Sequence, residues 1–174
     1  MASLQQQTLH GFFQQAKRRI VPAAVASDAE AAKTSGRSLG WAEFAALFAS
    51  SSRIVACVGS RVLLSLGDEA VVRAALTAEH ARKPIAVLVT GGAKGPDSFG
   101  AEWALAAGVP VREYLPEWVA FGNGAGMQRN ALIVAHASLL MAFPAVNRSE
   151  SRGTRQTMET AAGLAYMTVK VSEL

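Results

Sequence analysis

The sequence predicts an α/β fold, a Rossmann-like three-layer sandwich with a mostly parallel sheet of about five strands. From residue 53 onward, short apolar runs rich in strand-forming residues alternate with stretches of helical periodicity. The runs are apolar at consecutive positions, which is typical of parallel strands covered by helices on both faces. Glycine-rich segments follow several of these runs, at the points where the next helix should begin.

Five strands and four helices are expected in alternation. The strands are expected at 53–59, 85–92, 109–115, 138–144 and 166–171. The helices between them are expected at about 68–80, 98–107, 127–137 and 153–165. Ahead of the first strand, Trp41, Phe44 and Phe48 recur at helical spacing, which predicts a short amphipathic helix within 38–50, with Ser38 as a candidate N-cap.

The chain divides into three expected parts. Residues 1–20 form a glutamine-rich tail, residues 21–37 a linker, and residues 38–174 the domain, with its core at 53–171. With 174 residues, 51% of them hydrophobic, the chain can bury one substantial core. Cys57 is the single cysteine, which excludes a disulfide framework. No apolar run is long enough to cross a membrane.

Four glycine-containing segments are expected at the edge of the sheet where ligands bind: 59–61 (GSR), 91–97 (GGAKGPD), 122–130 (GNGAGMQRN) and 151–154 (SRGT). Glycine lets backbone N–H groups approach an anion. The cations of these segments could neutralise phosphate: Arg61, Lys94, Arg129 and Arg152. Asp97 could accept hydrogen bonds from ribose hydroxyls, and Trp118 could stack on a base or pack its loop down. Alternatively, the glycines serve only tight turns.

Several site classes are disfavoured. The loop 91–97 has neither the GxGxxG spacing of a dinucleotide fingerprint nor the Lys-Ser/Thr ending of a Walker A loop. The three histidines are scattered, so no metal site is predicted, and no cofactor is expected. The net charge of +4 permits contact with nucleic acid but is too small to indicate it alone.

The successive segments VGSR, VTGGAKGPDSFGAEWALAAGVPV, AGMQRN, LLMAFP and RGT resemble the motifs of the SLOG superfamily, and most closely its YspA branch, which is related to the YpsA proteins. The resemblance covers about residues 53–171. It implies a domain that binds a nucleotide or a nucleotide-derived ligand. Relatives in the superfamily include LOG-type phosphoribohydrolases, the DNA-processing protein DprA and sensor domains of antiviral systems.

The chemistry and the resemblance together give a set of candidate ligand-binding residues: Gly59, Ser60, Arg61, Gly91, Gly92, Lys94, Gly95, Asp97, Arg129, Asn130, Gly153 and Thr154. LOG-type enzymes follow their Gly-Thr with a glutamate that assists N-glycosidic cleavage. Here Gln156 stands at that place and Glu159 one helical turn later. Arg129 and Glu159 remain as catalytic candidates, and the departure favours binding or sensing over hydrolysis.

The tail contains a pattern that resembles a PIP box, the motif that binds the sliding clamp PCNA. Its residues are Gln6, Leu9, Phe12 and Phe13, and a basic run follows at 17–19. A short 3₁₀ turn would place Leu9 and Phe12 on one side, as a plug for an apolar groove. His10 and Gly11 stand where the clamp-dependent degron subtype has Thr-Asp, so that subtype is not supported.

Rival interpretations remain open at this stage. The tail has no acidic residue before position 28, which also describes a transit peptide for a mitochondrion or plastid, or its aromatic pair could pack on the domain. The leading hypothesis is a nucleotide-binding domain tethered to the clamp in replication, repair or nucleotide sensing, nuclear in a eukaryote and cytoplasmic in an archaeon. The alternatives are an N-glycosidic hydrolase and a DprA-like module in direct contact with DNA. A homo-oligomer is left open.

Overall fold

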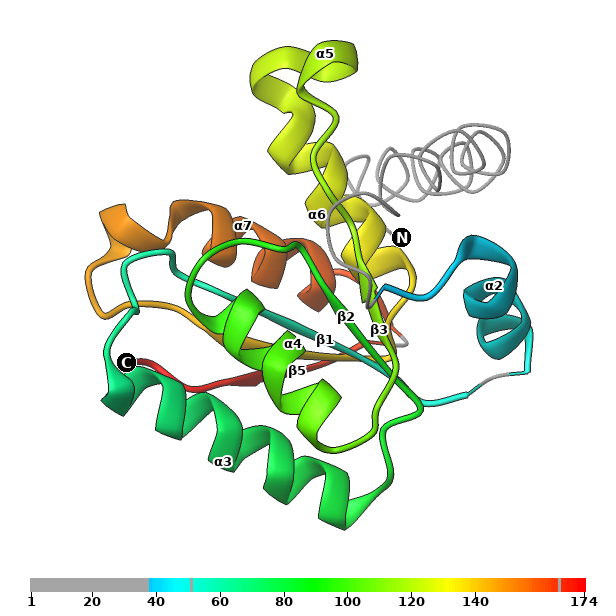
Figure 1. Ribbon diagram of the computed structural model, residues 1–174. Coiled ribbons are helices and arrows are strands. Elements are labelled where there is room, and N and C mark those ends of the chain that lie inside the picture. The colour runs from blue at the N-terminus through cyan, green and yellow to red at the C-terminus, as the bar shows by residue number, and fades with distance from the viewer. Residues whose placement is uncertain (1–37, 51, 166) are drawn as a thin grey trace.

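The computed structural model describes residues 38–50, 52–165 and 167–174 (Figure 1). Its strands are β1 (Ile54–Gly59), β2 (Val87–Thr90), β3 (Val111–Glu113), β4 (Leu139–Phe143) and β5 (Thr168–Val171). Its α-helices are α2 (Trp41–Ala49), α3 (Leu66–Arg82), α4 (Pro96–Ala106), α5 (Trp118–Phe121), α6 (Ala125–Ala135) and α7 (Arg152–Ala162). The 3₁₀ turns η1 (Gly122–Gly124) and η2 (Arg148–Ser151) precede α6 and α7.

The five strands form one sheet in the order β3-β2-β1-β4-β5, and every neighbouring pair is parallel. This confirms the predicted α/β, Rossmann-like fold class. The chain builds outward from β1 to β3 on one side and then crosses to β4 and β5 on the other. The order therefore reverses between β1 and β4, which pair from Val55 opposite Leu139 to Gly59 opposite Phe143. In open parallel sheets, ligand-binding crevices lie at such a reversal.

The central position of β1 explains why its sequence is apolar at consecutive positions. Val55 and Cys57 face the core that the sheet shares with α3 and α4. Ala56 and Val58 face the second core, on the side of α6 and α7. These two helical layers cover opposite faces of the sheet (Figure 1). Burying an aliphatic side chain stabilises the fold by about 1.5–3 kcal/mol. Apolar residues are therefore favoured at every position of a strand that is covered on both faces.

The residues before α2 lie along the free edge of β3 and do not start a helix. Ser38 forms a parallel bridge with Val111, and its hydroxyl accepts a hydrogen bond from the backbone N–H of Glu113 at 3.2 Å. The expected N-cap role of Ser38 is therefore wrong, since α2 begins only after Gly40. Helix α2 then buries Phe44 completely in the core on the α6 side of the sheet.

Helix α5 is a four-residue helix in a stretch that the sequence indicated only as a loop. None of its side chains is buried. It lies at the tip of an arm, formed with η1 and the first turns of α6, that rises above the sheet and the other helices (Figure 1). A segment this short has too few residues to show helical periodicity, which is why its sequence gave no helix signal.

The tail and the linker lie outside the residues that the structure describes. The motif at residues 6–13 and the boundaries at 20 and 37 therefore stay predictions. Across the described ranges of the domain, no helix combines the length and hydropathy that crossing a membrane requires.

Candidate functional site

The carboxyl ends of β1 and β4 meet at one edge of the sheet, and α4 begins beside them. The backbone N–H of Ser60 donates to the carbonyl of Phe143 at 3.0 Å, which ties the two strand ends together. A β-carbon at Gly59 would lie 2.8 Å from that same carbonyl oxygen and would overlap the ring of Pro96. Glycine at position 59 therefore allows the start of α4 to approach the end of β1.

The loop from Gly91 to Asp97 connects β2 to α4 through two left-handed positions. Gly92 has φ +63° and Gly95 has φ +84°, a region that residues with a side chain rarely adopt. A β-carbon at Gly95 would also lie 2.9 Å from the carbonyl oxygen of Ser60. These glycines therefore fold the loop back onto the end of β1.

Asp97 braces this loop from the first turn of α4. Its Oδ1 accepts from the backbone N–H of Gly59 at 3.1 Å, and its Oδ2 accepts from that of Gly91 at 3.0 Å. Burial raises the pKa of Asp97, against the opposing influence of Arg129 and of the backbone donors. Because the side chain is 3% exposed and both oxygens bind the backbone, we revise the ribose contact expected for Asp97 to a structural role.

Arg129 extends from α6 to the same strand ends and is 7% exposed. Its Nη1 donates to the carbonyl of Gly91 and lies 3.9 Å from Oδ2 of Asp97. Its Nε has no hydrogen-bond partner within the described part of the chain. Burial lowers the pKa of Arg129, which Asp97 opposes and Arg61 reinforces. The guanidinium nevertheless stays protonated at neutral pH, because its ordinary pKa is above about 12.

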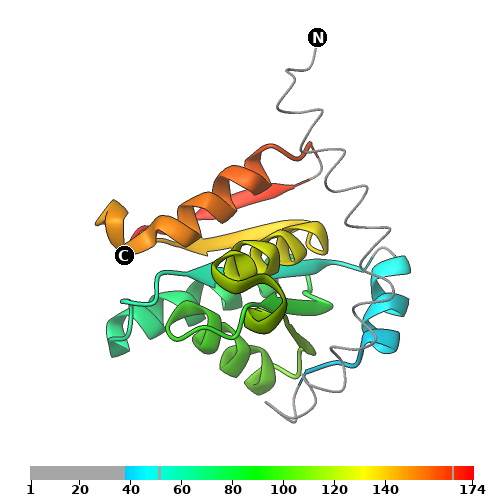
Figure 2. The same ribbon diagram turned by 90° about the horizontal axis from the view of Figure 1, so that it is seen from above.

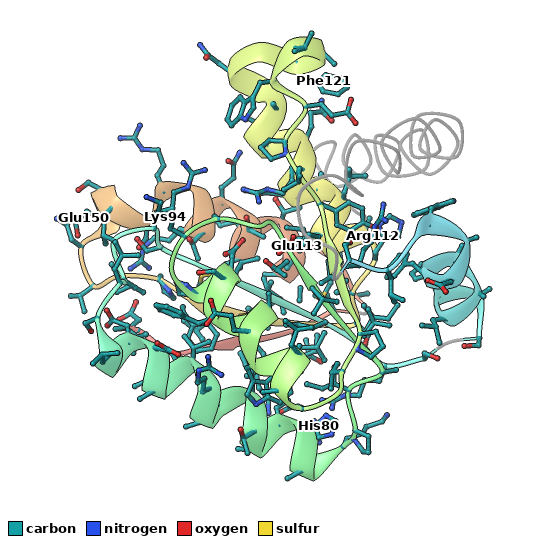
Figure 3. The ribbon with its side chains drawn as sticks, viewed as in Figure 1. His80, Lys94, Arg112, Glu113, Phe121 and Glu150 are labelled. Atoms are coloured by element: carbon teal, nitrogen blue, oxygen red, sulfur yellow. The ribbon has the colours of Figure 1, made fainter. Side chains whose placement is uncertain are left out.

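Three exposed cations accompany Arg129 at this edge. Arg61 follows β1, Lys94 lies in the loop after β2, and Arg152 begins α7. Among the residues that the structure describes, none of the three forms a salt bridge. Figure 3 shows Lys94 at the same end of the molecule as Glu150 of η2. The three cations are thus available to a bound anion.

Two buried serines fix the connection from β4 to α7. The hydroxyl of Ser60 donates to the carbonyl of Glu150 at 2.6 Å. The hydroxyl oxygen of Ser151 accepts from the backbone N–H of Ala145 at 2.6 Å. The side chain of Ser60, one of the candidate ligand-binding residues, is therefore engaged with the protein itself.

The remaining candidate residues differ in how open they are. Asn130 is half-buried and directly follows Arg129 on α6. Thr154 is buried in the first turn of α7. Gly153 beside it is exposed, and nothing lies within 4 Å of a β-carbon built there. The start of α7 is thus open to solvent at Gly153 and closed at Thr154.

The stretch from Ser38 to the end of α5 contains three of the five strands and the bracing loop around Asp97. Residues 38–121 match the model of the YspA, cpYpsA-related SLOG family (YAcAr). This match supports the SLOG resemblance and extends it toward the N-terminus, over α2. The YAcAr match ends at Phe121, so the motifs around Arg129 and Gly153 lie beyond it. Neither a search of curated proteins nor a search of solved structures found a match.

The acidic residues at this edge differ from those expected. Glu159 is exposed on α7, about 140° around the helix from the buried Thr154, so it does not share the side of α7 that packs inward. Glu113, by contrast, ends β3 and is half-buried, with its Oε1 4.0 Å from a β-carbon built on Gly92. Glu113 was not among the candidate residues, because the strand was expected to continue to residue 115 and Glu113 lay within it, whereas β3 ends at Glu113. No cluster of three potential metal ligands occurs in the described ranges.

Proposed function

We propose that this domain binds a nucleotide or a nucleotide-derived ligand at the carboxyl edge of the sheet. The observation that carries the proposal is the buried guanidinium of Arg129, held beside Asp97 where the strands end. Around it lie exposed cations without an acidic partner in the described residues: Arg61, Lys94 and Arg152. Phosphate groups have the charge and the acceptor oxygens that such a set of cations binds. The YAcAr match supports the same ligand class through the SLOG resemblance.

The phosphate is expected between the loop 91–97 and the start of α7. The first turn of a helix favours an anion because its N–H groups and its dipole point outward. At Gly153 that turn is exposed and unobstructed. Arg152 adds a charge at the same place, so the anionic part of the ligand has both backbone donors and side-chain cations within the same turn.

The arrangement favours binding over cleavage. N-glycosidic hydrolysis needs a carboxyl group that can reach the reacting bond. The carboxylate of Asp97 is occupied by backbone N–H groups, and Glu159 lies on the exposed side of α7. One observation favours a hydrolase: the carboxyl group of Glu113 lies beside Gly92, at the carboxyl edge of the sheet.

Calorimetry with AMP, ADP-ribose and ribose 5-phosphate tests the binding proposal. We expect a dissociation constant in the micromolar range for at least one of them, and at least about tenfold weaker binding for the Arg61→Ala/Arg152→Ala double variant. The matched control pairs Lys83→Ala with Arg73→Ala, two cations of α3 and its C-cap that are not among the candidate ligand-binding residues. If the whole panel fails to bind, or if the double variant binds as tightly as the parent, the proposed site is wrong.

The hydrolase alternative has its own test. The protein is incubated with nucleoside monophosphates, and free base is measured by chromatography. Release of base that disappears in Glu113→Gln would assign an N-glycosidic hydrolase with Glu113 as its acid. Binding without release of base would support the sensing role.

We propose in addition that the tail tethers this domain to the sliding clamp PCNA. The support is the sequence pattern of Gln6, Leu9, Phe12 and Phe13, followed by the basic run at 17–19. A linker at 21–37 would let the tail act independently of the domain. A clamp tether would place a nucleotide sensor at sites of DNA replication or repair, in the nucleus of a eukaryote or the cytoplasm of an archaeon.

A further inference from the structure

The arm that carries α5 exposes large apolar side chains. Trp118 is 53% exposed, Phe121 is 50% exposed, and Val119 is fully exposed. Figure 3 shows Phe121 at the tip of the arm, and Figure 2 shows the arm from above, between α7 on one side and α4 on the other. Exposed aromatic side chains grouped on one short segment indicate a contact surface.

The position of Trp118 connects this surface to the candidate ligand site. Its Cη2 lies 4.0 Å from the place that a β-carbon on Gly126 would take. Gly126, Arg129 and Asn130 are spaced i, i+3 and i+4 along α6, so they lie on the same side of that helix. Since Arg129 reaches the strand ends from this side, the indole lies on the same side of α6 as Arg129, beside a residue about one helical turn before it.

Trp118 differs in its environment from the other two tryptophans. Trp103 is 6% exposed, and its Nε1 donates to the hydroxyl of Thr77 at 2.9 Å. Trp41 packs against Phe44 in the core on the α6 side. Of the three tryptophans, Trp118 is the one whose side chain is mainly open to solvent, while part of its ring lies against α6.

We propose that the indole of Trp118 is the platform on which an aromatic base of the ligand stacks, while the cations of the carboxyl edge hold its phosphate. This inference rests on the proposed nucleotide-binding function and narrows it, because a platform for a base selects nucleotides over phosphorylated sugars. Every base has a flat π-face, so Trp118 selects for the presence of a base and not for its identity. The indole lies close enough to α6 that a β-carbon at position 126 would be in ordinary van der Waals contact with it.

The test compares AMP with ribose 5-phosphate by calorimetry. In Trp118→Ala, the affinity for AMP should fall about 5- to 150-fold, the range that loss of one base–aromatic stack produces. The affinity for ribose 5-phosphate should stay within about twofold, because the sugar phosphate does not reach the indole. Trp118→Phe should restore most of the AMP affinity. Val119→Ala, a fully exposed residue of the same short helix, is the matched control and should bind both ligands as the parent does.

Each other outcome separates this inference from the function on which it rests. Equal losses for both ligands in Trp118→Ala, or no loss for either, would overturn the platform while leaving nucleotide binding in place. Failure of the parent protein to bind any nucleotide or sugar phosphate would overturn the proposed function itself. If gel filtration shows that Trp118→Ala abolishes self-association and AMP affinity is unchanged, the surface is an interface between copies of the chain, and the platform is wrong.

Discussion

The guanidinium of Arg129 occupies the space that a side chain at position 91 would need. Its Nη1 donates to the carbonyl of Gly91, and a β-carbon built on Gly91 would overlap the guanidinium. The φ angle of Gly91 does not lie in the left-handed region, so the requirement for glycine is one of space. A small residue after β2 thus admits a buried cation from a helix 38 residues further along the chain.

Gly91→Ala should displace Arg129 and weaken both the fold and ligand binding. Forcing an extra carbon into a filled site costs about 1–3 kcal/mol, and here the displaced group also leaves Asp97 without its cation. Urea unfolding measures the stability, and calorimetry with AMP measures the affinity. Gly124→Ala is the control, since nothing lies within 4 Å of a β-carbon there, and it should change stability by less than about 0.5 kcal/mol. Equal stability of the two variants would contradict the steric argument.

Asp97→Ala should be among the most destabilising single substitutions in the domain. It removes the acceptor for the backbone N–H groups of Gly59 and Gly91 and leaves the buried charge of Arg129 uncompensated. Breaking a buried pair in this way costs about 3–5 kcal/mol. Glu102→Ala, which removes an exposed partner of Arg73, should cost less than about 1 kcal/mol when both are measured by urea unfolding. A small loss in the free energy of unfolding of Asp97→Ala would mean that solvent reaches the loop 91–97.

The strands of the sheet could be predicted from the sequence, because each strand is marked by a run of consecutive apolar residues. β1 and β4 read as strands because they are buried on both faces and therefore apolar at every position. The loop from 91 to 97 was recognised because its glycines and its position after a strand are themselves the signal for an anion site. Both kinds of information lie within a few consecutive residues.

The roles of individual side chains depended on contacts between distant segments, which no local pattern contains. Asp97 has the chemistry to bind a ribose. Its hydrogen bond with the backbone N–H of Gly59 forms only because the fold places the end of β1 beside it. Ser38 has the chemistry of an N-cap, and only the edge of β3 shows its other partner. Glu113 was overlooked because an acid within an expected strand is unremarkable until the neighbouring loop is placed.

Glu79 should govern the stability of the domain in acid. This buried carboxylate binds Arg82, Lys170 and Arg53. The hydrogen bond from Arg82 is the largest cause that lowers the pKa of Glu79 from 4.5 to about 2, and burial opposes it. The unfolded chain therefore takes up the proton at higher pH than the folded chain does. Stability from this group is present above about pH 4.5 and is lost as the pH falls toward about 2.

Urea unfolding at a series of pH values between about 7 and 2 measures this dependence. Glu79→Gln should be less stable than the parent at neutral pH and should show a flatter decline in acid. Glu102→Gln, at an exposed carboxylate, should keep the slope of the parent. An unchanged slope in Glu79→Gln would assign the acid sensitivity to other carboxyl groups.

The aromatic pair of the tail should matter for a partner and not for the fold. If residues 6–13 form a clamp motif, Phe12→Ala/Phe13→Ala should abolish binding to PCNA, since each aromatic anchor in so small an interface contributes about 2 kcal/mol or more. The melting temperature should stay unchanged. Gln14→Ala/Gln15→Ala, immediately after the motif, is the matched control and should bind as the parent does. Surface plasmon resonance with the host clamp measures the affinity, and calorimetry measures the melting temperature.

A peptide of residues 1–20 separates the motif from the domain. It should bind the clamp alone, and its affinity should fall as salt increases, because the basic run at 17–19 is solvent-exposed in a free peptide and its attraction to an acidic surface is screened. Loss of several degrees of melting temperature in the double phenylalanine variant would show instead that the pair packs on its own domain. Cleavage of the chain between residues 20 and 36 in cells would identify a transit peptide. Either result would exclude the tether, because a tail that is packed away or removed cannot carry this domain to the clamp.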